Sequence, residues 1–289
     1  MKKVLLNFLI LMFSVSMYSF DWPQKEIMSD SFFSYFGEYR GGILSPSLVF
    51  SSTEEVKSAD KGRVIAVISE HNEETDFFES TLGNSIIIAH PDNLLTVYSN
   101  LDGDNNEENF NLREIEKGTS LGYCGNSAWQ EGNSLLEFQV VDTSNKTYIN
   151  PRILMPRIGN EPIISLKNIT LENKKGKSFD INVQKNIPSG IYKIYRDISK
   201  DTMIYKSTIL INGASVDTIT YNTLKENNNK LSTNGKQKYS TNIIYPNKQK
   251  QMLGEISLPK GKNRITIVIA DILGKEKSLT YSIDAYWFY

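Results

Sequence analysis

The side chains best suited to catalysis or metal binding are scarce in this chain. It has two histidines, His71 and His90, and one cysteine, Cys124. His71 lies in an acidic stretch and His90 precedes a proline, and neither has a second histidine at a spacing typical of zinc ligands. We therefore expect two solvated histidines. Cys124 ends a strand-like segment, which indicates a buried, unreactive thiol, and a single cysteine excludes an intrachain disulfide.

Three short segments match the motifs of one enzyme family. They are residues 40–44 (RGGIL), 96–101 (TVYSNL) and 134–140 (SLLEFQV). Together they resemble the catalytic core of the lysostaphin/LytM-type zinc endopeptidases, which cut peptide crosslinks in bacterial cell walls. In that family the three segments read His-x-Gly-Ile-Asp, Val-Tyr-x-His-Leu and His-x-His-Phe-Glu-Val.

Four further segments support the resemblance. Residues 61–64 stand where the family has Asp-Gly-x-Val, and residues 83–90 resemble its Gly-Asn-x-Val-x-Ile-x-His. Residues 116–127 are similar to its Val-x-Lys-Gly-Gln-x-Ile-Gly-x-x-Gly-Asn-Thr, and residues 150–151 match the Asn-Pro that closes the domain. Because the matches occur in order and at plausible spacing, the resemblance implies the fold of the family.

The resemblance also implies where the metal site would lie and that its ligands are missing. A hydrolytic zinc site needs three side chains with free lone pairs and one position open for water. The three ligands of the family fall on Arg40, Leu44 and Glu137, and its two further histidines fall on Asn100 and Leu135. Leucine has no donor atom and a guanidinium is a permanent cation, so only Glu137 keeps a ligating group. The resemblance therefore implies a protein with no zinc cofactor, no general base and no peptidase activity.

The replaced positions suggest how the emptied site is stabilised. Positions that share a metal must lie within a few ångströms of one another, so Arg40 and Glu137 should be close enough for a charge-assisted hydrogen bond. We predict an Arg40–Glu137 ion pair in place of the metal, with Leu44 and Leu135 packed around it. The alternative is that Arg40 points to solvent and no pair forms.

Hydrophobic runs and turn residues predict an all-β chain with two domains. The first, residues 21–156, is expected to be an antiparallel β domain, because short strand-like segments alternate with turns and no amphipathic helix of useful length occurs. The resemblance implies that this domain is LytM-like. The strands expected between residues 55 and 141 are 56–59, 63–69, 85–90, 94–101, 120–125 and 135–141.

A second β domain is expected after a linker at residues 157–163. Residues 164–289 hold short strand-like segments whose number and turn spacing are typical of an Ig-like β-sandwich. Within this domain the polar residues 224–238 are predicted to be a mobile loop, and residues 242–245 to be a strand. The aromatic end, residues 286–289, is predicted to be the last core strand rather than an exposed patch.

The N-terminus predicts export. Lys2 and Lys3 precede an apolar run at residues 4–17, which is the organisation of a secretory signal peptide over residues 1–20, with cleavage near Ser19 or Phe20. The run is shorter than the roughly 20 residues of a spanning helix, so no stable membrane anchor is expected. With 32 basic and 33 acidic residues the formal net charge is -1, which gives no electrostatic case for nucleic acid as a partner.

These expectations lead to three functional hypotheses. The first is an exported protein of the bacterial periplasm or cell envelope whose inactive peptidase-like domain binds peptidoglycan or regulates a cell-wall hydrolase, as amidase activators do. Binding needs only shape and a few polar groups, and Tyr98 and Asn126 are the candidate groove residues. The second is an active zinc endopeptidase with a non-standard site. The third is an adhesin or scaffold that acts through the Ig-like domain.

Overall fold

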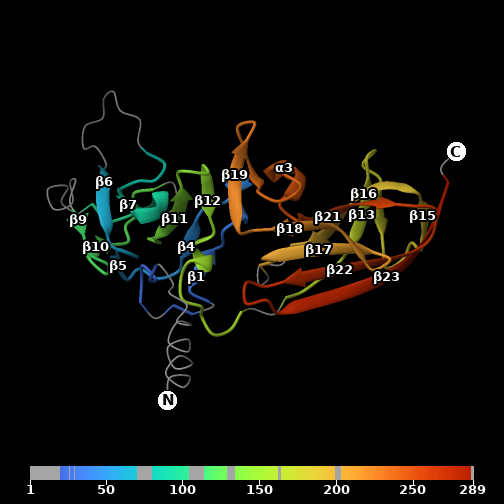
Figure 1. Ribbon diagram of the computed structural model, residues 1–289, viewed down its shortest axis with the longest axis horizontal. Coiled ribbons are helices and arrows are strands. Elements are labelled where there is room, and N and C mark those ends of the chain that lie inside the picture. The colour runs from blue at the N-terminus through green and yellow to red at the C-terminus, as the bar shows by residue number, and fades with distance from the viewer. Residues whose placement is uncertain are drawn as a thin grey trace, which may run out of the picture.

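The computed structural model describes residues 20–25, 27–28, 30–69, 80–103, 114–128, 134–161, 164–198 and 203–287. Across these residues the chain is mostly β-structure, with one short helix, α3 (Thr241–Ile244), and the 3-10 turns η1 (Pro91–Asn93) and η2 (Pro151–Ile153). The predicted all-β class is confirmed. The described residues include no helix with the length and apolar character to cross a membrane. The molecule is elongated, with the N-terminal and C-terminal halves at opposite ends (Figure 1).

One antiparallel sheet organises the N-terminal half. Its strands follow the order β20-β19-β12-β11-β8-β7-β6-β9, and β4 pairs with both β11 and β1. Two smaller ribbons, β2–β3 and β5–β10, lie outside it. The strand bounds are β1 Phe32–Ser34, β2 Tyr39–Arg40, β3 Ile43–Leu44, β4 Leu48–Phe50, β5 Glu55–Lys57, β6 Gly62–Ile68, β7 Ser85–Ala89, β8 Leu94–Ser99, β9 Glu114–Ile115, β10 Ser120–Tyr123, β11 Glu137–Asp142, β12 Thr147–Ile149, β19 Thr223–Asn227 and β20 Lys230–Thr233.

Each strand predicted between residues 55 and 141 is present, shifted at its ends by at most two residues. β11 is the centre of the sheet, since it pairs with β8 along its whole length and with β4 and β12 on its other edge. Its inward residues Phe138 and Val140 are wholly buried with Phe50, Ile86 and Tyr98 in one hydrophobic cluster. Burial of these large side chains is the main stabilising term for this half.

Two further sheets enclose the core of the C-terminal half. One has the order β14-β13-β16-β21 and the other β15-β23-β22-β17-β18, and Ile194, Ile209, Ile256 and Ile267 pack between them. This arrangement agrees with a β-sandwich, while Ig-like topology stays a prediction. The strand bounds are β13 Thr170–Asn173, β14 Ser178–Asp180, β15 Asn186–Pro188, β16 Gly190–Asp197, β17 Lys206–Ile211, β18 Ala214–Thr220, β21 Lys250–Leu258, β22 Gly261–Ala270 and β23 Glu276–Tyr286.

The structure corrects the predicted mobile loop at residues 224–238. Most of this stretch is the hairpin β19–β20, which turns at Asn228 and Asn229 with φ of 51° and 57°. Two residues at positive φ make the tight turn that matches the twist of a hairpin, and asparagine tolerates that conformation. Leu224 is wholly buried in this hairpin, so a mainly polar stretch nevertheless has an apolar anchor.

The β19–β20 hairpin joins the sheet of the N-terminal half. β19 pairs antiparallel with β12, with Leu224 opposite Tyr148, and Figure 1 shows the two strands side by side. A mixed hydrophobic cluster lies beneath this junction, with Phe36 and Leu44 from one half and Tyr221 and Ile244 from the other. A cut at the predicted linker, residues 157–163, would therefore separate strands that share one sheet.

Two other predictions for the C-terminal half are wrong. Residues 242–245 were expected to be a strand, but helix α3 covers most of them, and its Ile244 is wholly buried. At the end of β23, Tyr286 is 50% exposed and Trp287 is 59% exposed, so these aromatic residues do not belong to the core. Trp287 instead has Lys260 Nζ over its ring at 6.0 Å. The predicted signal segment lies outside the described residues, apart from Phe20, which is wholly buried.

Candidate functional site

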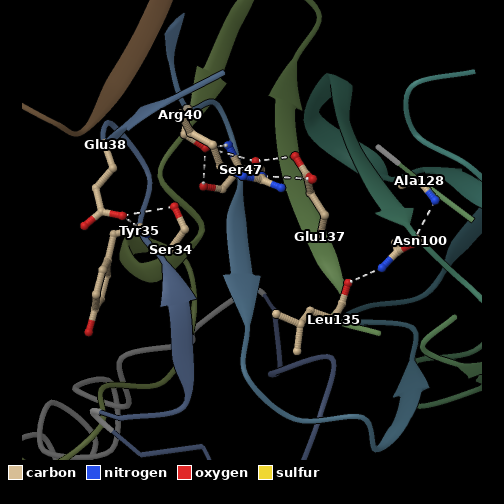
Figure 2. Close-up of polar contacts among 10 residues, drawn as sticks. Ser34, Tyr35, Glu38, Arg40, Ser47, Asn100, Ala128, Leu135 and Glu137 are labelled. Atoms are coloured by element: carbon tan, nitrogen blue, oxygen red, sulfur yellow. Dashed lines mark hydrogen bonds and ion pairs between the residues drawn. The ribbon is translucent and has the colours of Figure 1, made fainter. Parts of the chain in front are cut away.

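The predicted ion pair stands at the start of β11. Arg40 comes from the β2–β3 hairpin, which turns at Gly41 and Gly42 with positive φ, and Glu137 lies between Val49 of β4 and Ser99 of β8. Arg40 Nη1 is 3.0 Å from Glu137 Oε2, and the two side chains are 15% and 7% exposed. The predicted Arg40–Glu137 pair is confirmed, and Figure 2 shows the contact.

Glu137 is held by a second partner that the sequence analysis missed. Ser47 Oγ donates a hydrogen bond of 2.6 Å to Glu137 Oε1, so both carboxylate oxygens are engaged. Ser45 Oγ lies 3.1 Å from Ser47 Oγ, and both serines are buried. A serine just before a strand is not part of any motif, so the sequence could not predict that Ser47 binds Glu137. The contact is visible only because β4, which follows Ser47, pairs with β11. A metal ion at Glu137 would have to displace an arginine and a hydroxyl from the same carboxylate.

The Asn100 side chain forms hydrogen bonds with the backbone of three residues. Its Nδ2 donates to the carbonyl of Leu135 at 2.8 Å, and its Oδ1 accepts from the amides of Ser127 and Ala128 at 3.0 and 2.9 Å. The residue is wholly buried and has φ of 63°, a conformation that asparagine adopts more readily than most residues. Where the resembled family has a histidine, this chain therefore has a structural amide whose donor and acceptor are both used (Figure 2).

The two leucines of the aligned positions lie in different surroundings. Leu44 is wholly buried in the mixed cluster between the halves, and its N–H donates to Thr241 Oγ1 at 3.0 Å. Leu135 is 8% exposed and meets Asn100 through its carbonyl. The structure thus joins four of the aligned residues in two direct contacts, Arg40 with Glu137 and Asn100 with Leu135. Leu44 packs in the mixed cluster between the halves.

The candidate groove residues do not form a groove together. Tyr98 is wholly buried, packs against the ring of Phe138 at 5.1 Å, and accepts a hydrogen bond of 2.7 Å from the N–H of Ala59. Burial raises the pKa of Tyr98 to about 12. The prediction for Tyr98 is wrong because its place on β8 directs it into the core. Asn126 is exposed.

His90 is buried rather than solvated, so that prediction is wrong as well. Its Nδ1 lies 2.8 Å from the carbonyl of Lys61 and its Nε2 lies 2.7 Å from Thr96 Oγ1. The ring of Phe20 packs edge-on against it, with centroids 5.1 Å apart. Burial lowers the pKa of His90. Both ring nitrogens are used within the fold, and His71 lies outside the described residues.

The remaining candidates for metal chemistry are also dispersed. Within the described ranges, histidine, cysteine, aspartate and glutamate side chains form no group of three or more that could hold a metal ion. Cys124 is buried, as predicted, and Gln24 Nε2 lies 3.3 Å from its Sγ. Burial raises the pKa of the Cys124 thiol to about 11, so the thiol is protonated at neutral pH.

Comparisons with known proteins show that part of the first half of the chain matches a known peptidase family. The family model described as "Peptidase family M23" matches residues 47–151, and a second model without a description matches residues 163–286. An uncharacterized protein of Treponema pallidum (strain Nichols) is 34% identical over 125 residues, which is 40% of this chain and 82% of that protein.

Two solved structures are similar over part of the chain. One is a zinc-containing peptidase from Vibrio cholerae, with 21% identity, a TM-score of 0.33, and 42% of this chain and 36% of that chain covered. The other is a mutant form of the catalytic domain of the prophage-encoded M23 protein EnpA from Enterococcus faecalis. It has 17% identity, a TM-score of 0.34, and 45% of this chain and 93% of that chain covered.

Proposed function

Because residues 47–151 form a domain of peptidase family M23, we propose that this chain is an exported, catalytically inactive relative of the peptidases that acts by binding in the bacterial cell envelope. Its partner in this proposal is peptidoglycan or a cell-wall hydrolase. The match of the domain to a peptidase family supports a role at the cell wall, and the residues at its aligned site support binding rather than cleavage.

The observation that carries the proposal is the Arg40–Glu137 ion pair. Hydrolysis at a zinc site needs three donor side chains and an open position for water. Here an arginine cation lies 3.0 Å from the one remaining carboxylate, and a serine hydroxyl engages its second oxygen. A divalent cation at the same place would meet a positive charge within bonding distance of its only anionic ligand, which disfavours its binding.

The full chain should be tested, because β19 and β20 complete the sheet of the M23 domain. We expect protein purified with zinc in the buffer to contain far less than one equivalent of zinc by mass spectrometry and to release no soluble muropeptides from purified peptidoglycan. An active M23 endopeptidase serves as the positive control. Stoichiometric zinc together with released muropeptides would overturn the proposal.

Binding is tested with the same preparation. We expect the chain to co-sediment with insoluble peptidoglycan, or to increase the release of soluble peptides from peptidoglycan by a cell-wall amidase when it is added to that enzyme. A chain that does neither, yet still lacks zinc and activity, would favour a scaffold that acts through its C-terminal half.

A further inference from the structure

Turns and strand ends of the C-terminal sandwich meet at the end of the molecule opposite the M23 domain (Figure 1). The turn between β13 and β14, residues 174–177, lies beside the start of β16, with which the end of β13 pairs. The turn between β21 and β22 lies there too, because β21 finishes opposite the start of β16. The end of β23 pairs with the start of β22. We call residues 174–177, 188–191, 259–262 and 284–287 the distal end.

Two consecutive aromatic residues of the distal end are exposed. Tyr286 and Trp287 have half or more of their surface accessible to solvent. The Tyr286 carbonyl accepts a hydrogen bond of 2.7 Å from the N–H of Ser189, so the backbone that carries both rings is fixed to the segment between β15 and β16. Ile191, at the start of β16, adds a third exposed apolar side chain. Exposed apolar groups that gather at one place mark an interaction surface, and tryptophan and tyrosine are enriched where lipid headgroups meet acyl chains.

Lysines surround these aromatic residues. Residues 174–177 read KKGK and residues 259–262 read PKGK, so both turns carry lysines and no acidic residue. All of these lysines are exposed. Lys260 Nζ lies 6.0 Å from the centroid of the Trp287 ring, which places one ammonium over the exposed aromatic surface. Positive charge and apolar surface therefore occur together at the distal end.

The charge of the distal end indicates an anionic partner, and its residue types favour lipid over protein. Glu172 and Asp284 are the acidic residues in these segments and at the adjoining strand ends, so positive charge remains in excess. Protein–protein interfaces are enriched in arginine and depleted in lysine, whereas a bilayer surface with anionic headgroups attracts lysine as well as arginine. Lysines around an exposed tryptophan and tyrosine match both the charge and the polarity of that surface.

We propose that the distal end binds reversibly to an anionic phospholipid surface. Tyr286 and Trp287 lie at the level of the headgroups, and the lysines of the two turns face the lipid phosphates. This contact goes beyond the proposed function and does not depend on it, because the distal end shares no residue with the M23 domain. A molecule attached in this way holds its M23 domain away from the bilayer (Figure 1).

Vesicle co-sedimentation tests the proposal with the chain from Phe20 onward. This form keeps every residue that the structure describes and lacks the apolar run at residues 4–17, which would itself bind lipid. Vesicles of phosphatidylcholine alone are compared with vesicles of phosphatidylcholine mixed with phosphatidylglycerol. We expect much stronger binding to the mixed vesicles, and a fall in that binding as the salt concentration rises from about 0.1 M to about 1 M.

Single substitutions separate the two components of the surface. Lys174→Gln and Lys260→Gln should each weaken binding to the mixed vesicles by about fivefold, because each removes one charge near the anionic surface. Trp287→Ala should weaken it by about fivefold or more, because the ring leaves water when the protein binds. Circular dichroism verifies that each variant is folded.

The chain offers a matched control for each kind of change. Lys206→Gln removes an exposed lysine of the same half, at the end of β17 opposite Ala270 and away from the distal end. Tyr123→Ala removes a ring on β10 that is 59% exposed, as Trp287 is. Neither change should affect binding.

Several results would overturn the proposal. They are an absence of co-sedimentation with the mixed vesicles at low salt, equal binding to both kinds of vesicle, and an effect of Lys174→Gln or Trp287→Ala no larger than that of its control. Retention on immobilised polyglutamate without binding to vesicles would also overturn it, and would indicate an acidic protein surface as the partner.

Discussion

Removing one charge of the Arg40–Glu137 pair should destabilise the protein more than removing both. In Arg40→Leu the Glu137 carboxylate loses the guanidinium nitrogen at 3.0 Å and keeps the Ser47 hydroxyl at 2.6 Å, in a position where its side chain is 7% exposed. In the double variant Arg40→Leu with Glu137→Leu no charge remains to be solvated. The comparison therefore isolates the cost of a stranded carboxylate.

The structure sets the expected magnitudes. Breaking a buried pair from one side costs roughly 3–5 kcal/mol, and the 15% exposure of Arg40 indicates some access of water. The loss of unfolding free energy for Arg40→Leu should therefore lie near the lower end, about 3 kcal/mol. In the double variant the Ser47 hydroxyl loses the Glu137 carboxylate but has Ser45 Oγ at 3.1 Å as another partner, so the loss should be about 1 kcal/mol.

Urea unfolding followed by circular dichroism measures these losses, with an unchanged m-value as the check that the same transition is compared. Lys57→Leu is the matched control. It breaks the Lys57–Glu55 contact of 3.1 Å, whose side chains are 29% and 35% exposed, and exposed pairs contribute little to stability. Equal losses for the single and double variants, or a loss for Arg40→Leu no larger than for Lys57→Leu, would refute the reasoning.

Three further perturbations address the buried polar residues. Tyr98→Phe removes the acceptor of the Ala59 N–H and should cost about 1–3 kcal/mol, so an unchanged melting temperature would contradict its role. Burial lowers the pKa of His90, so the unfolded chain binds a proton that the folded chain does not. Stability should be complete above about pH 6.5 and fall as pH drops through that value toward the folded pKa, a dependence that His90→Gln should reduce. Cys124, with its pKa raised to about 11, should react slowly with a disulfide reagent at about pH 8 when folded and rapidly in denaturant.

The sequence was enough to predict strands that have a clear local pattern and an ion pair between positions that align with ligands of one metal. Strands such as β6, β7 and β8 combine β-branched or apolar runs with turn residues on both sides, and these local signals do not need the rest of the fold. The Arg40–Glu137 pair followed from a different argument, since positions that align with ligands of one metal must converge. The first inference uses signals within one short segment, and the second uses the resemblance, which places two distant segments at one site.

Features that depend on distant partners could not be read in this way. The β19–β20 hairpin is mostly polar, and what stabilises it is pairing with β12 and burial of Leu224 between the halves. His90 precedes a proline, as a turn residue would, yet the carbonyl of Lys61 makes it a core residue. In each case a long-range contact decides between two local structures that composition does not distinguish: a loop or a hairpin at residues 224–238, and a solvated or a buried side chain at His90.

One of the aligned positions, Leu44, is part of the contact between the halves. Leu44, where the resembled family has an aspartate, packs with Tyr221 and Ile244 of the C-terminal half and donates its N–H to Thr241. A carboxylate there would be desolvated in a hydrophobic cluster, which is strongly unfavourable without a cation. An aspartate at position 44 would therefore place a charge in the core, and replacing Arg40 would leave the Glu137 carboxylate without its cation. Arg40 and Glu137 depend on each other through their ion pair, and Leu44 depends on the C-terminal half, so changes at these positions act on stability as well as on the site.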